Sequence, residues 1–279
     1  MGVYFTSRRR DIDPKILHAE DVIYNDYGDT VRVSEKNKDL LKFGSILSTV
    51  GTTEQTIAEF QGSTLRETYT STNSIDSIIC TDNTPYTGTL VVEGHTISGS
   101  DLTFVSQSKA LNGHTAATLD TPIARATRAY ISGSSALATP ATDKIYIYDA
   151  TVATGTTSGV PDVAAATHLM VNGVEYQSEK GATSLSSQDY WIVSSIYAAI
   201  EKKTGASATV RLRHRQIGNL LRTRAPKLHL DADGASEAVV NFDPYLIIPK
   251  NSDIELTVEG STSAIQISAG INGYLAVII

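Results

Sequence analysis

The stretch FDPYLIIPKNSDIELTVEGSTSAIQISAGINGYLAVII, Phe242 to Ile279, decides the fold class. It holds four short runs of β-forming residues separated by segments rich in Gly, Asn, Pro and Ser: Tyr245–Ile248, Ile254–Val258, Ile265–Ile267 and Tyr274–Ile279. Short runs with such turn residues between them predict an antiparallel β-sandwich. The last run is apolar to its end, so we expect a paired strand inside a sheet. The segment Gly270–Gly273 is predicted to be a turn.

The same pattern of short strands continues upstream. Seven runs are predicted to be strands: Thr56–Phe60, Ile75–Cys80, Gly88–Glu93, Leu102–Gln107, Ala116–Leu119, Ala126–Ile131 and Lys144–Tyr148. Several of them alternate apolar and polar residues, which is typical of half-buried antiparallel strands. The turns between them contain Gly, Asn and Ser, as in Asn112-Gly113. We therefore predict a first β-sandwich domain over residues 46–150.

A chain of 279 residues can form two domains, each with its own core. Residues 151–167 are mostly small, with two glycines and a proline, which favours a linker. Residues 168–279 then form a second sandwich. Within it, residues 188–202 have the alternation of a strand, although their second half is also compatible with a helix; the β-branched content favours the strand. The predicted fold class is all-β, with two antiparallel β-sandwich domains of jelly-roll or immunoglobulin-like type.

Residues 1–45 differ from the rest because they carry scattered apolar residues among many charges. They are too polar to form a core alone. The apolar residues, among them Val3, Tyr4 and Phe5, favour an extended N-terminal arm that lies on a neighbouring subunit over a disordered tail. An edge strand packed on the chain's own domain is the alternative.

Composition excludes several classes of protein. The chain has 23 basic and 30 acidic residues, a formal net charge of -7, so no global positive field favours nucleic acid. Cys80 is the single cysteine, which excludes an internal disulfide and a zinc site built on several thiolates. The N-terminus has no signal-peptide pattern and no apolar run is long enough to span a bilayer, so we expect no membrane contact.

The chemical motifs of enzymes are missing from the sequence. The six histidines are scattered without metal-ligand spacing and are predicted to be polar residues at strand ends, with His95 facing solvent or a sheet end. No serine elbow and no phosphate-binding glycine loop occurs. Asp231 and Asp233 resemble the start of a calcium loop, but the later carboxylate is misplaced, which favours a turn. We therefore predict no catalytic residue, no cofactor and no metal.

Two clusters of arginine remain as candidate sites for protein contacts. Arg8, Arg9 and Arg10 are consecutive, and Arg211, Arg213 and Arg215 alternate along one face of a predicted strand. A buried row of unpaired arginines would cost several kcal/mol. This row is therefore predicted to lie on a solvated face or to meet acidic groups across an interface between chains.

Several segments also resemble virion proteins of tailed bacteriophages. The stretch Val91–Gly133 contains the turn Leu111-Asn-Gly-His-Thr115 and the sequence Pro122-Ile-Ala-Arg125. Further segments of the same kind are DLLKFG (39–44), VGTT (50–53), DYWIVSSIYAAIEKKTGASATVRLRHR (189–215), DPYLIIPKNSDIELTV (243–258) and INGYLA (271–276). The resemblance covers most of the chain from residue 39 onward and rests on turns and strands.

The resemblance implies a non-enzymatic particle component that binds other virion proteins and is assembled in the cytoplasm of a host bacterium. A capsid decoration or cement protein is the leading expectation, as a homo-oligomer such as a trimer or ring; a neck, collar or tail part is the alternative. A carbohydrate- or receptor-binding module would need exposed aromatic platforms, for which the candidates are Tyr86, Tyr130, Tyr190, Trp191 and Tyr245. A glycan hydrolase is disfavoured because no paired-carboxylate motif occurs.

Overall fold

The computed structural model describes residues 22–24, 30–58, 67–83, 88–133, 137–178, 180–202, 205–234, 236–261 and 265–278. These residues form antiparallel sheets with little helix, so the predicted all-β class is confirmed. No helix in this part of the chain is long and apolar enough to cross a membrane. Arg8, Arg9, Arg10 and the first part of the expected arm lie outside the described residues.

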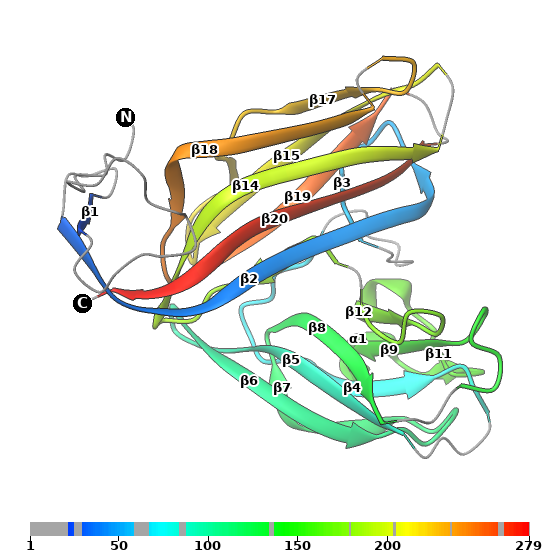
Figure 1. The fold of residues 1–279 in the computed structure, drawn as a ribbon. Coiled ribbons are helices and arrows are strands. Elements are labelled where there is room, and N and C mark those ends of the chain that lie inside the picture. Colours follow the sequence, from blue (N-terminus) through cyan, green and yellow to red (C-terminus); the bar gives the residue numbers. More distant parts are fainter. Residues whose placement is uncertain are drawn as a thin grey trace.

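Two sheets form the unit that contains both ends of the described chain (Figure 1). The first has the order β1 (Val22–Tyr24), β2 (Thr30–Val50), β20 (Ile265–Ile278), β14 (Asp189–Lys202) and β18 (Glu237–Ile248). The second has the order β13 (Ala182–Ser184), β19 (Ser252–Gly260), β15 (Ser207–Gln216) and β16 (Arg222–Thr223), with β17 (Leu228–Asp231) beside β15 and β3 (Gln55–Thr56) beside β19. Buried residues of both sheets, including Trp191, Val210, Leu256 and Ile267, form one hydrophobic core. We call this unit the terminal unit.

The middle of the chain has a second core. One sheet has the order β12 (Thr167–Asn172), β9 (Lys144–Tyr148), β4 (Ile75–Cys80) and β7 (Ala117–Ile123); the other has the order β6 (Asp101–Ala110), β5 (Thr89–Ser98) and β8 (Arg125–Ser132). Ile78, Leu90, Ala129 and Ile147 from both sheets are buried together. We call this the inserted unit, since it lies between two parts of the terminal unit in the sequence and below that unit in Figure 1.

The first predicted domain boundary, at residues 45 and 46, differs from the structure. Strand β2 runs through it and pairs with β20 from Val33 to Val50. Ile46, Val50 and Ile57 belong to the core of the terminal unit, not to that of the inserted unit. Residues 30–45 therefore belong to a strand that pairs with another strand of the same chain. The sequence did not predict this strand because many residues of the segment are charged. The strand forms nevertheless because its pairing with β20 is made by backbone groups.

The predicted linker also differs from the structure. Residues 150–167 contain α1 (Ala150–Ala153), the strand pair β10 (Thr156–Thr157) and β11 (Val160–Pro161), and the 3-10 helix η1 (Ala164–Ala166). Asp149 caps α1 by accepting from the backbone N–H groups of Thr151 and Val152. The small residues Ala153 and Ala166 are buried against Tyr146 and Tyr148. The segment thus connects β9 to β12 within one sheet, and its small residues allow close packing.

The segment Gly270–Gly273 is not a turn, because β20 passes through it without a break. Each glycine allows the close approach of a neighbour. A Cβ atom at Gly270 would lie 2.3 Å from the hydroxyl oxygen of Tyr197, and one at Gly273 would lie 2.3 Å from the carbonyl oxygen of Ile192. Both distances are too short for any side chain. The strand prediction for residues 188–202 is confirmed by β14, the neighbour that makes these contacts.

Cys80 lies in β4 and is fully buried. Burial raises the pKa of its thiol to about 11, so at pH 8 only about one thiol in a thousand is ionised. We expect a disulfide reagent such as 5,5′-dithiobis(2-nitrobenzoic acid) to react with the native chain at least about a hundredfold more slowly than with the chain unfolded in guanidinium. Equal rates in the two states would contradict the burial of Cys80.

Candidate functional site

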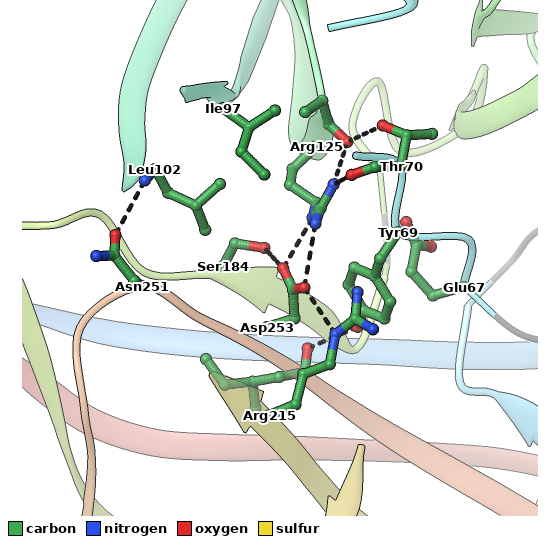
Figure 2. A network of polar contacts seen from close by, with 12 residues as sticks. Glu67, Tyr69, Thr70, Ile97, Leu102, Arg125, Ser184, Arg215, Asn251 and Asp253 are labelled. Atoms are coloured by element: carbon green, nitrogen blue, oxygen red, sulfur yellow. Dashed lines mark hydrogen bonds and ion pairs between the residues drawn. The ribbon is translucent and has the colours of Figure 1, made fainter. Parts of the chain in front are cut away.

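A network of buried polar contacts surrounds the carboxylate of Asp253, at the start of β19 (Figure 2). This carboxylate is 0% exposed and accepts hydrogen bonds from three residues. Arg125 donates through Nε at 2.8 Å and Nη2 at 3.2 Å, Arg215 donates through Nε at 3.1 Å, and Ser184 Oγ donates at 2.8 Å. A buried carboxylate is tolerated only with partners of this kind. Asp253 is therefore held as a fully paired anion.

Arg125 brings the inserted unit to this carboxylate. It is the first residue of β8, is 3% exposed, and also donates through Nη1 to the carbonyl oxygens of Thr70 and, at 2.8 Å, Ala124. Arg215 and Ser184 belong to the terminal unit. Arg125 and Asp253 therefore join the two units through a bidentate ion pair at their junction.

Tyr69 lies between the two guanidinium groups. The carbon at the centre of the guanidinium is 5.2 Å from the ring centroid for Arg125 and 4.9 Å for Arg215, distances that allow cation–π contacts. The hydroxyl donates to the carbonyl oxygen of Ile254 at 3.4 Å. Burial raises the pKa of Tyr69 well above its usual range, and the charges of Glu255 and Glu67 raise it further. The phenol therefore stays protonated and serves as a neutral spacer between two cations.

A second buried ion pair lies beside the first. Lys180 Nζ is 2.6 Å from Glu67 and donates to the carbonyl oxygens of Ala126 at 3.1 Å and His168 at 2.9 Å. Burial raises the pKa of Glu67, while the charge of Lys180 acts in the opposite direction. Lys180 forms a β-bridge with Ala58, next to Ile57 of the terminal core, whereas Ala126 and His168 belong to the inserted unit. This lysine therefore also connects the two units.

Two further polar contacts cross the same junction. Asn251, in the left-handed region with φ of 54°, accepts from the backbone N–H of Leu102 at 2.9 Å and donates to Asp101 at 2.9 Å. Lys42 of β2 donates to the carbonyl oxygen of Thr127. Burial, followed by the charges of Lys180 and Arg128, lowers the pKa of Lys42 to about 7. The junction is thus held by polar contacts at several separate points.

The alternating arginines of β15 have acidic partners in their own chain. Arg213 donates to both carboxylate oxygens of Glu54, at 2.8 and 2.5 Å, and Arg211 donates to Glu259 at 2.8 Å. Arg215 is the partner of Asp253 already described. Each of the three charges therefore has a partner within the chain, whereas the sequence predicted a solvated face or partners in another chain. A contact of Arg211, Arg213 or Arg215 with a second chain stays a prediction.

The structure corrects two predictions about candidate sites. His95 was expected at a solvent-facing or sheet-end position but is buried in β5, as are His168 and His214 in their strands. Trp191, a candidate platform for a glycan, is 0% exposed in the core of the terminal unit and is unavailable to a ligand. Within the described residues, no group of three or more His, Cys, Asp and Glu side chains could hold a metal ion.

The buried histidines predict a loss of stability in acid. Burial lowers the pKa of His95, His168 and His214 to about 4, below the ordinary 6.5. The unfolded chain therefore binds more protons below pH 6.5, and the free energy of unfolding falls as the pH drops from 6.5 toward 4. Each histidine contributes up to about 1.4 kcal/mol per pH unit. Urea unfolding between pH 7.5 and 4.5 measures this slope.

His214 offers a matched comparison for that slope. Its Nδ1 accepts from Arg224 Nε at 3.1 Å, so protonation would break this contact. We expect His214→Gln to reduce the acid slope, and His229→Gln, at an exposed position in β17, to leave it unchanged. An unchanged slope in His214→Gln would show that this histidine is not held in its neutral form.

Comparison with solved structures gives a weak likeness. No family model and no curated protein sequence matches the chain. A chain from a structure described as "Structure of infectious bursal disease virus Gt strain" aligns with a TM-score of 0.22 and 14% identity, covering 92% of this chain and 75% of that one. A TM-score this low carries no argument about fold or function.

Proposed function

We propose that the chain is a non-enzymatic structural component of a bacteriophage virion, and within that class a capsid decoration or cement protein that stabilises the particle through protein–protein contacts. The observation that carries the proposal is the buried charge network at Asp253. It joins the terminal and inserted units into one block, and a block of this kind suits a protein whose role is to hold a fixed shape.

The space around the network supports a structural role over a chemical one. Glu67, Tyr69, Arg125 and Lys180 line a void of about 10 Å³. A void of that size holds about one water molecule. Groups with shifted pKa values gather at active sites, but structural ion pairs shift pKa values too. Among the described residues, this void beside Glu67 is too small for a substrate, so the raised pKa of Glu67 is better explained by burial at the junction.

The segments that resemble virion proteins contribute several residues of the network. Arg125 ends the sequence Pro122-Ile-Ala-Arg125, Asp253 follows the turn Pro249–Ser252, and Lys42 lies in the segment 39–44. Each of these residues makes a contact between the two units. In this proposal, the resembling segments specify how two sandwiches are joined.

The partners in this proposal are other virion proteins and further copies of the chain, arranged as a trimer or a ring. The N-terminal arm, with Arg8, Arg9 and Arg10, provides contacts between subunits, and the host bacterial cytoplasm is the place of assembly. A neck, collar or tail position is the alternative within the same class. The glycan-binding alternative is weakened because Trp191, the single tryptophan of the sequence, is buried in the core.

Particles purified from cells that produce the protein provide the test. We expect mass spectrometry to find this chain in a fixed copy ratio to the main shell protein. We also expect a mild chaotrope to remove the chain from the particles and dialysis to let it bind again. Binding of the purified chain to glycans on an array, with no binding to stripped particles, would favour the receptor-binding alternative. Absence of the chain from particles would contradict the virion assignment.

A further inference from the structure

One long strand of the terminal unit has an unpaired edge. Strand β2 pairs with β20 along one side, while on its other side β1 pairs only with Thr30 to Arg32. Within the described residues, no strand pairs with this second edge between Val33 and Phe43. An edge of this length presents backbone N–H and C=O groups that can pair with a further strand. This part of β2 runs past the inserted unit (Figure 1).

A groove of about 540 Å³ lies along this edge. Residues 40–43 of β2 line one wall, and residues of the inserted unit, including His95, Phe104 and Arg128, line the other. Leu41 is 54% exposed, Phe43 37% and Phe104 47%, so three of the exposed large apolar side chains of the described residues gather here. A groove with exposed apolar side chains beside an open strand edge fits an extended peptide that adds a strand.

The far wall of the groove also contains a buried polar atom without a partner. His95 is 4% exposed, its Nδ1 has no hydrogen-bond partner within the described residues, and its ring stands edge-on to Phe104 at 5.6 Å. Buried polar atoms usually have a partner. A backbone group that enters beside Phe104 can supply this one.

The N-terminal residues of the chain have the chemistry of a suitable occupant. Residues 1–10, MGVYFTSRRR, combine the β-forming run Val3–Thr6 with three arginines and no acid. Without them the chain has 20 basic residues, 23 less 3, against 30 acidic, a net charge of -10. The groove itself carries the carboxylates of Glu93 and Asp189 beside the cations of Lys42 and Arg128, so the attraction comes from the net charge of the whole chain. A cationic segment is therefore drawn to the remainder of the molecule.

We propose that the groove beside β2 receives residues 1–10 of a second copy of this chain, paired as an added strand along residues 33–43. Val3–Thr6 places apolar side chains against Leu41, Phe43 and Phe104, and the arginines reach the carboxylates at the rim. This inference rests on the proposed function, because it names the contact by which copies assemble.

Self-association of the full-length chain tests the proposal. Sedimentation velocity compares the wild type with Phe43→Arg, Phe104→Arg and a variant with serine at positions 8, 9 and 10. The control is Val239→Arg, at a side chain 61% exposed on β18 and outside the groove. A synthetic peptide of residues 1–12 in excess serves as competitor, with a scrambled peptide beside it. Circular dichroism checks that each variant is folded.

We expect each groove variant and the serine variant to weaken association at least about tenfold, which corresponds to about 1.4 kcal/mol. The peptide should dissociate the oligomer, while Val239→Arg and the scrambled peptide should leave it intact. A monomeric wild type, equal association of wild type and groove variants, or equal loss in Val239→Arg would overturn the proposal. If the chain is found on particles while groove variants associate normally, the groove inference alone fails and the virion assignment stands.

Discussion

Replacing Arg125 by methionine is expected to lower the free energy of unfolding by about 3–5 kcal/mol, because the change removes one partner of a buried ion pair. The carboxylate of Asp253 is 0% exposed and would keep only Arg215 and Ser184. Methionine retains much of the apolar stem of arginine, so little of the loss comes from packing. Urea unfolding at pH 7.5 measures the change.

Arg128 provides the matched control for this experiment. It lies on the same strand, but its side chain is 49% exposed and its nitrogen is 3.7 Å from Glu93. Exposed pairs contribute about 0–1 kcal/mol, so Arg128→Met should change stability by less than about 1 kcal/mol. If Arg125→Met had an effect as small as that of Arg128→Met, the network would not hold the two units together.

Deleting the last six residues, Tyr274 to Ile279, is expected to abolish cooperative folding. Tyr274–Ala276 are buried, and this half of β20 pairs with β2 on one side and with residues 189–192 of β14 on the other. The deletion would expose the edges of both strands and open the core beside Trp191. The lost burial and pairing would exceed a typical total stability of about 5–15 kcal/mol.

A point substitution in the same segment distinguishes the effect of losing part of β20 from the effect of losing one core side chain. Leu275→Ala removes one side chain from the core and should cost about 2–5 kcal/mol while unfolding stays cooperative. Solubility and the sharpness of the thermal transition distinguish the two cases. A truncated chain that stayed soluble and melted in one sharp transition would mean that β20 is not central to the terminal unit.

Strand positions could be predicted well from the sequence where apolar and polar side chains alternate within a short run. The predicted runs Ile75–Cys80 and Lys144–Tyr148 coincide with β4 and β9, and the predicted strand at 188–202 contains β14 (Asp189–Lys202). Strand β2 escaped prediction in its first half because the charged residues of 35–39 conceal the backbone pairing that makes it a strand. Gly270 and Gly273 were misread as turn residues because only the neighbouring strand reveals what they allow.

The charge network could not be predicted because its members are distant in the chain. Arg125 and Asp253 are 128 positions apart, and Glu54 meets Arg213 across 159 positions. The alternation of Arg211, Arg213 and Arg215 predicted a row on a solvated face or at an interface between chains, whereas the structure gives each arginine an acidic partner in its own chain. The sequence does not reveal that β3 and β15 both pair with β19. This long-range pairing places the acidic partners next to the arginines.

Cryo-electron microscopy of particles that contain this chain tests the central claim most directly. The account predicts repeated density on the particle surface that fits the terminal and inserted units as one block, with the Asp253 junction unchanged and contacts to neighbouring proteins outside it. Density at a neck or tail would keep the virion class and change the position. Particles with no density for this fold, from cells in which the protein is abundant, would contradict the account.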